Sequence, residues 1–178
     1  MLQSRNQVLV IDWNLIKLMN NSSDFFTIVV TFIVAMMLMI MPLPDWARSY
    51  RPEWIALALI YWNIAVPKKV GVGIAWMLGL CVDVIQGALL GQHALGFAIT
   101  AYIAIRFHQR VRVYPLHQQA MFVGMILLPY MSISLWILGI LGKDPKTWVY
   151  WAPVITSVLV WPWIFLVLRA VRKTASIY

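Results

Sequence analysis

The sequence predicts an all-α integral membrane protein, built as a six-transmembrane-helix bundle with both termini in the cytoplasm. Hydrophobic residues make up 62% of the 178 residues and charged residues only 11%, which is outside the range of soluble globular domains. The apolar residues form runs, several of them long enough to cross a hydrocarbon core about 30 Å thick. Most Lys and Arg residues fall in alternate loops between these runs, as expected for a multi-pass protein.

Charges and prolines divide the chain into six apolar runs, each of which we interpret as one span. The second run is the shortest. We expect its helix to begin at Pro52, because proline suits the first helical position and Glu53 is favourable near a helix N-terminus. The six predicted spans are residues 25–41, 53–66, 70–87, 90–105, 120–141 and 148–168.

The distribution of basic residues tests this division, because Lys and Arg are retained on the cytoplasmic side of a membrane. With both termini inside, ten of the 14 basic residues are cytoplasmic and four lie in outer loops. The split therefore agrees with six spans. The ten are Arg5, Lys17, Lys68, Lys69, Arg106, Arg110, Arg112, Arg169, Arg172 and Lys173, and the four are Arg48, Arg51, Lys143 and Lys146.

The segments outside the spans are short. We expect residues 1–24 to be a cytoplasmic extension, residues 25–172 to be the transmembrane domain and residues 173–178 to be a cytoplasmic tail. Apolar residues of the extension repeat at roughly helical spacing, which leaves both a helix on the inner membrane surface and a disordered segment open. No loop is long enough for an independent domain, so function must lie in the bundle or its short loops.

Small residues recur every four positions through the third and fourth runs. In a helix, small residues at this spacing form a groove that lets another helix approach closely. Both packing within the chain and contact with a partner's helix are compatible with the pattern. The series, which includes one acidic residue, consists of Gly71, Ala75, Gly79, Asp83, Gly87 and Gly91.

Asp83 is the acid deepest within a predicted span, and an ionisable group at such a position requires a partner or water. It lies about one turn from the outer end of the third span, near the polar turn that contains Gln86 and Gln92. One interpretation is a hydrogen-bonding or capping role at this turn. The other is a proton or substrate site, although no further acids or histidines follow it along a path.

The chain shows no pattern expected of an enzyme, a metalloprotein or a nucleic-acid-binding protein. His93, His108 and His117 lie in different segments without a second ligand at helical spacing. No nucleophile elbow or phosphate-binding loop is present. The net charge of +8 comes from small basic groups at the ends of apolar runs, which is typical of topology signals and headgroup contacts. We therefore expect no catalytic residue, no metal and no cofactor.

Several motifs follow one another over most of the chain from Met41 onward. They are the sequence MPLPD, an outer-side motif before the second span, the small-residue series and the C-terminal sequence WPWIFLVLRAVR. The positions that carry the pattern include Arg51, Pro52, Trp54, Tyr61, Trp62, Pro67, Gly71, Gly73, Asp83, Gly87, Leu90 and Gly91. In this ordered combination the chain resembles the MreD family of rod shape-determining proteins of Gram-negative bacteria.

This resemblance implies a non-enzymatic scaffold of the bacterial elongation (Rod) complex, located in the inner membrane. Such a scaffold binds MreC and supports lateral peptidoglycan synthesis and rod cell shape. RodA, a class B penicillin-binding transpeptidase and MreB are the further members of the complex that the resemblance implies. It also implies a fold similar to the substrate-binding subunits of energy-coupling-factor vitamin transporters. That similarity supports an alternative function, a membrane-embedded small-molecule binding or transport subunit.

Overall fold

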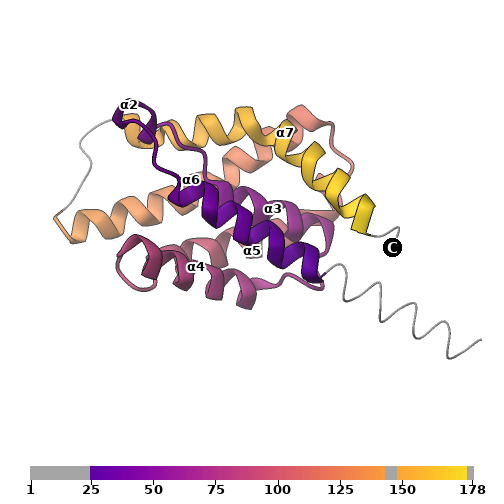
Figure 1. Ribbon diagram of the computed structural model, residues 1–178, viewed down its shortest axis with the longest axis horizontal. Helices are drawn as coiled ribbons and strands as arrows, with labels where there is room; N and C mark the ends of the chain where they lie inside the picture. The colour runs from indigo at the N-terminus through magenta and orange to yellow at the C-terminus, as the bar shows by residue number, and fades with distance from the viewer. Residues whose placement is uncertain (1–24, 143–147, 176–178) are drawn as a thin grey trace, which may run out of the picture.

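The computed structural model describes residues 25–142 and 148–175, and the regular structure within these ranges is entirely helical (Figure 1). The N-terminal extension expected at residues 1–24 lies outside the described residues. The main helices are Phe25–Ile40, α3 (Trp54–Ala65), α4 (Val72–Gln86), α5 (Gln92–Val111), α6 (Leu116–Ile140) and α7 (Ala152–Ala175). Short helical segments, α2 (Asp45–Arg48) and a 3-10 turn η1 (Trp148–Trp151), precede α3 and α7.

Each of the six predicted apolar segments coincides with one main helix. Two helices, Leu116–Ile140 and Trp148–Lys173, are long and apolar enough to cross a membrane by length and composition. Helices Phe25–Ile40, α3 and α4 are apolar but shorter. The architecture is therefore consistent with a membrane protein.

Four predicted boundaries need correction. Helix α6 begins at Leu116, four residues before the predicted start at residue 120. Pro52 and Glu53 precede α3, whose first residue is Trp54, because Glu53 has a non-helical ψ of 72°. Helix α5 continues to Val111, beyond the predicted end at residue 105. Helix α7 continues to Ala175, into the expected tail. In both latter cases the hydrogen-bonded helix extends beyond the apolar run, since a helix does not have to end where its apolar residues end.

The long helices alternate in direction between the two ends of the molecule (Figure 1). We call the end that carries α2 and the α4–α5 turn the polar end. The opposite end, called the basic end, carries the start of helix Phe25–Ile40, the α5–α6 turn and the end of α7. The first and last described residues thus lie at the same end.

Helix α3 forms the centre of the bundle. Its residues from Ile55 to Ile64 are all buried, and it contacts α5, α6 and α7. A helix that is apolar on all sides is expected in such an enclosed position. Helix α3 has 12 residues, which correspond to about 18 Å at 1.5 Å per residue. The neighbouring helices, rather than lipid, therefore provide most of its surroundings.

Candidate functional site

Asp83 organises the turn between α4 and α5. Its Oδ2 accepts a hydrogen bond from the Gly91 N–H at 2.8 Å, and its Oδ1 accepts one from the His93 N–H at 2.9 Å. These two N–H groups lie at the start of α5, where backbone donors lack partners within the helix. Asp83 is only 1% exposed. The carboxylate of α4 therefore caps the N-terminus of α5.

The side chain of His93 makes a third contact with the same carboxylate, with Nδ1 2.7 Å from Oδ1. Oδ1 already accepts the His93 backbone N–H, so a ring N–H donating to it gives a consistent hydrogen-bond pattern. This assignment places a proton on Nδ1. Sequence reasoning placed His93 outside any site, whereas the structure makes it the direct partner of Asp83.

The backbone of the same turn requires glycine at two positions. Gly87, directly after α4, has φ 62°, and Gly91, directly before α5, has φ 102°. Both values lie in the left-handed region, which glycine adopts without a steric penalty. In the predicted small-residue series, Gly87 and Gly91 therefore form the turn, and Gly71 lies just before α4.

The helical members of the series face α5 of the same chain. Ala75 and Asp83 are buried on α4. A Cβ atom added to Gly79 would lie 2.3 Å from the Cα atom of Ala94. Only a residue without a side chain allows the two backbones to approach so closely. The groove predicted from the sequence is thus filled by α5 in this bundle.

The predicted outer-side motif joins the polar end to the first helix. The guanidinium of Arg51 donates hydrogen bonds to the backbone carbonyls of Met39 and Met41, at the end of helix Phe25–Ile40. The carbonyl of Pro52 accepts the N–H of Trp54, the first residue of α3. Arg51 therefore fixes the connection between the first helix and the central helix.

Glu53 forms a second polar centre close to the first. Its backbone N–H donates to the Ser157 Oγ of α7 at 3.0 Å, and its carboxylate accepts a hydrogen bond from the Tyr130 hydroxyl of α6 at 3.3 Å. The rings of Tyr130 and His93 lie 6.2 Å apart. Residues from α4, α5 and α6, together with Glu53 before α3, therefore converge at the polar end.

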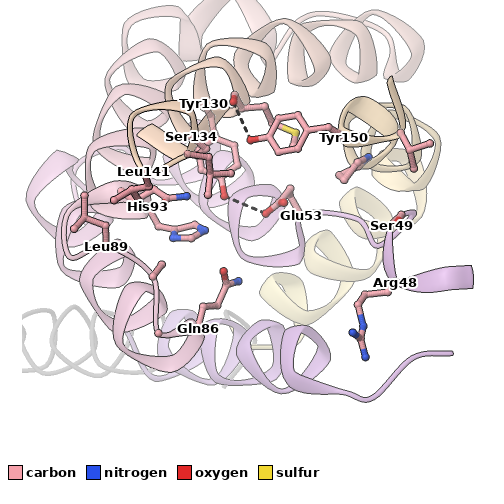
Figure 2. Close-up of a pocket in the computed structure, with 17 residues that line it drawn as sticks. Arg48, Ser49, Glu53, Gln86, Leu89, His93, Tyr130, Ser134, Leu141 and Tyr150 are labelled. Atoms are coloured by element: carbon pink, nitrogen blue, oxygen red, sulfur yellow. Dashed lines mark hydrogen bonds between the residues drawn. The ribbon is translucent and has the colours of Figure 1, made fainter. Parts of the chain in front are cut away.

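Glu53, His93 and Tyr130 line a cavity of about 730 Å³, which we call the polar cavity. Figure 2 shows Glu53 and His93 directed toward its interior from different parts of the chain. Tyr150 lies at its edge and donates to the Met131 carbonyl at 3.1 Å. The lining residues are Arg48, Ser49, Glu53, Gln86, Gly87, Ala88, Leu89, Gln92, His93, Tyr130, Met131, Ser134, Leu138, Leu141, Val149, Tyr150 and Pro153.

Sequence reasoning did not identify Glu53, Tyr130 or Ser134 as members of one site. A usable signal was present for two of them: in the six-span interpretation, Glu53 and Ser134 fall in the outer halves of their spans, as Asp83 and His93 do, whereas Tyr130 lies near the middle of its span. Among the described residues, no group of three or more His, Cys, Asp and Glu side chains could hold a metal ion. The arrangement can donate and accept hydrogen bonds, and it contains no activated nucleophile in the part of the chain described.

The fold and site define a class of protein: an apolar helical bundle with a hydrogen-bonded polar end. The chain belongs to the MreD family of rod shape-determining proteins, whose family model matches residues 19–171. A similar protein, the rod shape-determining protein MreD of Haemophilus influenzae, is 31% identical over 158 residues, covering 87% of this chain and 96% of the relative. No solved structure matches the chain. Family membership supports a role in determining rod shape.

Proposed function

We propose that the chain is a non-enzymatic scaffold in the bacterial inner membrane that binds MreC within the elongation complex. The observation that carries this proposal is membership of the MreD family across residues 19–171. In this proposal, RodA, a class B penicillin-binding transpeptidase and MreB are further members of the complex. The scaffold supports lateral peptidoglycan synthesis by holding its partners together rather than by chemistry of its own.

The surface of the bundle supports a role in binding other helices. Helices α4 to α7 each keep large apolar side chains exposed after the bundle has formed, including Met77, Tyr102, Trp136 and Trp163. Lipid or the transmembrane segment of a partner can cover such surfaces. The small-residue groove of α4 is occupied by α5, so we place the partner contact on one of these exposed faces.

Site-specific photo-crosslinking tests this proposal. A photoreactive amino acid is introduced at one of four exposed positions, Met77, Tyr102, Trp136 or Trp163, in cells that express MreC. We expect crosslinks to MreC from one or two neighbouring faces and none from the others. Samples without irradiation are the control. If no position crosslinks to MreC and the intact chain does not co-purify with it, the scaffold proposal is wrong.

A second function, binding or transport of a small molecule, is favoured by the polar cavity. Its volume of about 730 Å³ lies within the range of ligand sites, roughly 300–1,000 Å³. The carboxylate of Glu53, the imidazole of His93 and the hydroxyl of Tyr130 are the convergent polar groups that such a site needs. Recovery of a pair of cytoplasmic ATPases in place of MreC would favour this second function.

A further inference from the structure

A second cavity, of about 350 Å³, lies at the basic end of the bundle, and we call it the basic cavity. Three arginines contribute to its wall, and the described residues that line it include no acidic side chain. Its other lining residues are aromatic, aliphatic or amide side chains. The full lining is Tyr61, Ile64, Ala65, Arg112, Gln119, Trp161, Phe165, Arg169 and Arg172.

The first arginine is held in place by the backbone of the central helix. Arg112 Nε donates to the Ile64 carbonyl at 2.8 Å, and its Nη2 donates to the Ala65 carbonyl at 2.6 Å. These carbonyls lie at the C-terminus of α3, where backbone acceptors lack partners within the helix. A guanidinium has five N–H donors, so Arg112 keeps donors for a ligand after making both contacts.

The other two arginines come from the last turns of α7. Arg169 and Arg172 are three residues apart, so they project from the same face of the helix. Both line the basic cavity together with Tyr61 of α3. The two guanidiniums and Arg112 therefore converge on the basic cavity from two different elements. The three positive charges repel one another unless an anion lies between them.

Two buried polar atoms in the wall lack a hydrogen-bond partner. Gln119 is 4% exposed, and its Nε2 donates to the carbonyls of Val111 and Tyr114. These two acceptors orient the amide, so its Oε1 is the unpartnered atom. Trp161 is fully buried, and its Nε1–H is also unpartnered. Buried polar groups normally have hydrogen-bond partners. The acceptor Gln119 Oε1 and the donor Trp161 Nε1 can therefore bind a ligand or water.

We propose that the basic cavity binds a phosphate-bearing anionic headgroup, and that its source is an anionic phospholipid such as phosphatidylglycerol. The three guanidiniums suit a phosphate, for which arginine provides paired N–H donors. The Oε1 of Gln119 can accept a hydrogen bond from a headgroup hydroxyl. The proposal uses the membrane location given above but does not depend on MreC binding.

The surroundings of the cavity favour a lipid over a free anion. Exposed apolar side chains, Leu166, Val167 and Val171, lie on the same segment of α7, and acyl chains can pack against them. The ring of Phe165 contacts the rings of Tyr61 and Trp161, and all three line the cavity with the arginines. Basic pockets between helices at the cytoplasmic side of a membrane are known headgroup sites.

Native mass spectrometry of the full-length protein in a neutral detergent tests the proposal. The probes are short-chain phosphatidylglycerol, short-chain phosphatidylcholine and inorganic phosphate. We expect phosphatidylglycerol to bind at least about tenfold more tightly than phosphatidylcholine. Both lipids carry a phosphate, but the trimethylammonium of phosphatidylcholine is repelled by the three arginines and offers no hydroxyl to Gln119 Oε1. Inorganic phosphate at equal concentration should not displace it.

Two double variants locate the binding. R169Q/R172Q removes two arginines of the basic cavity and should abolish the preference for phosphatidylglycerol. R106Q/R110Q removes the same charge from exposed positions of α5 outside the cavity and should keep it. Equal binding of the two lipids, or the same loss in both double variants, would overturn the proposal. Displacement of phosphatidylglycerol by inorganic phosphate would overturn the lipid assignment. Co-purification of R169Q/R172Q with MreC is measured separately, so that a failure of the lipid proposal can be told apart from a failure of the scaffold proposal.

Discussion

The carboxylate of Asp83 and the imidazole of His93 contact each other at 2.7 Å across the turn that joins α4 to α5. The same carboxylate holds two backbone N–H groups at the start of α5. One acidic side chain therefore sets the position of His93, which lines the polar cavity. The Asp83 carboxylate therefore determines both the structure of the turn and the position of the His93 imidazole in the polar cavity.

This arrangement predicts different results for two substitutions of Asp83. D83N keeps the shape and one acceptor oxygen, but its amide nitrogen cannot accept a hydrogen bond. D83L leaves all three donors unsatisfied, each at a cost of about 1–3 kcal/mol when buried. We expect D83N to be modestly destabilised and to restore rods in a deletion strain, and D83L to fail. Thermal unfolding in detergent and cell shape are the measurements.

The result for D83N also decides between the two interpretations of Asp83. A cap and hydrogen-bond acceptor needs the oxygen, whereas a proton carrier needs the ionisable group. If D83N protein is stable, inserted in the membrane and bound to MreC while the cells are round, Asp83 has an active ionic role. Rod-shaped cells would support the role in the turn.

Gly79 should not tolerate even one methyl group. The Cβ atom of G79A would lie 2.3 Å from Ala94 Cα, so the backbones of α4 and α5 must separate. Overpacking of this kind commonly costs about 1–3 kcal/mol, and G79L should cost more. G73A, also in α4, is the matched control because nothing lies within 4 Å of its added Cβ. Equal melting temperatures for G79A and G73A would contradict the observed contact.

Filling the polar cavity separates the two proposed functions. Ser134 is buried and lines the cavity, so the side chain of S134F would occupy space that a ligand needs. A scaffold should retain MreC binding and restore rods with this variant, provided that the protein reaches the membrane. S132F, at an exposed neighbouring position of α6, is the control. Loss of rod shape with S134F but not with S132F, at equal protein levels, would favour small-molecule binding.

The proposed six-span topology makes a prediction that does not depend on either function. Reporter fusions after Lys69, Arg112 and Tyr178 should be cytoplasmic, and fusions after Arg48 and Lys143 should be periplasmic. The physical reason is the excess of basic residues on one side of the membrane. A periplasmic C-terminus together with a cytoplasmic loop at Arg112 would mean that an odd number of spans follows Arg112, which contradicts the six-span topology.

The positions of the helices could be predicted from the sequence because they depend on local apolar runs. Their ends could not always be predicted: α5 continues through Arg106 and Arg110, which interrupt the apolar run but not the backbone hydrogen bonds. The turn role of Asp83 was also among the predicted interpretations, because the acid lies close to a polar turn in the sequence.

The polar cavity could not be predicted in the same way. Glu53 and Tyr130 are 77 positions apart and meet only because α3 and α6 pack in one bundle. The contact of Asp83 with His93 depends on the left-handed backbone of Gly87 and Gly91, which reverses the chain between them. Periodicity reports which face of a helix is apolar, but it does not say which other helix will cover that face.

The enclosure of α3 has a consequence for how the protein is made. Residues Ile55 to Ile64 are all buried, and three of the helices that contact α3, namely α5, α6 and α7, follow it in the sequence. When the ribosome has just synthesised α3, it has not yet synthesised these neighbours. During translation this short helix must therefore be sheltered by lipid, the insertion machinery or a chaperone, and it reaches its final environment only when the last helix arrives.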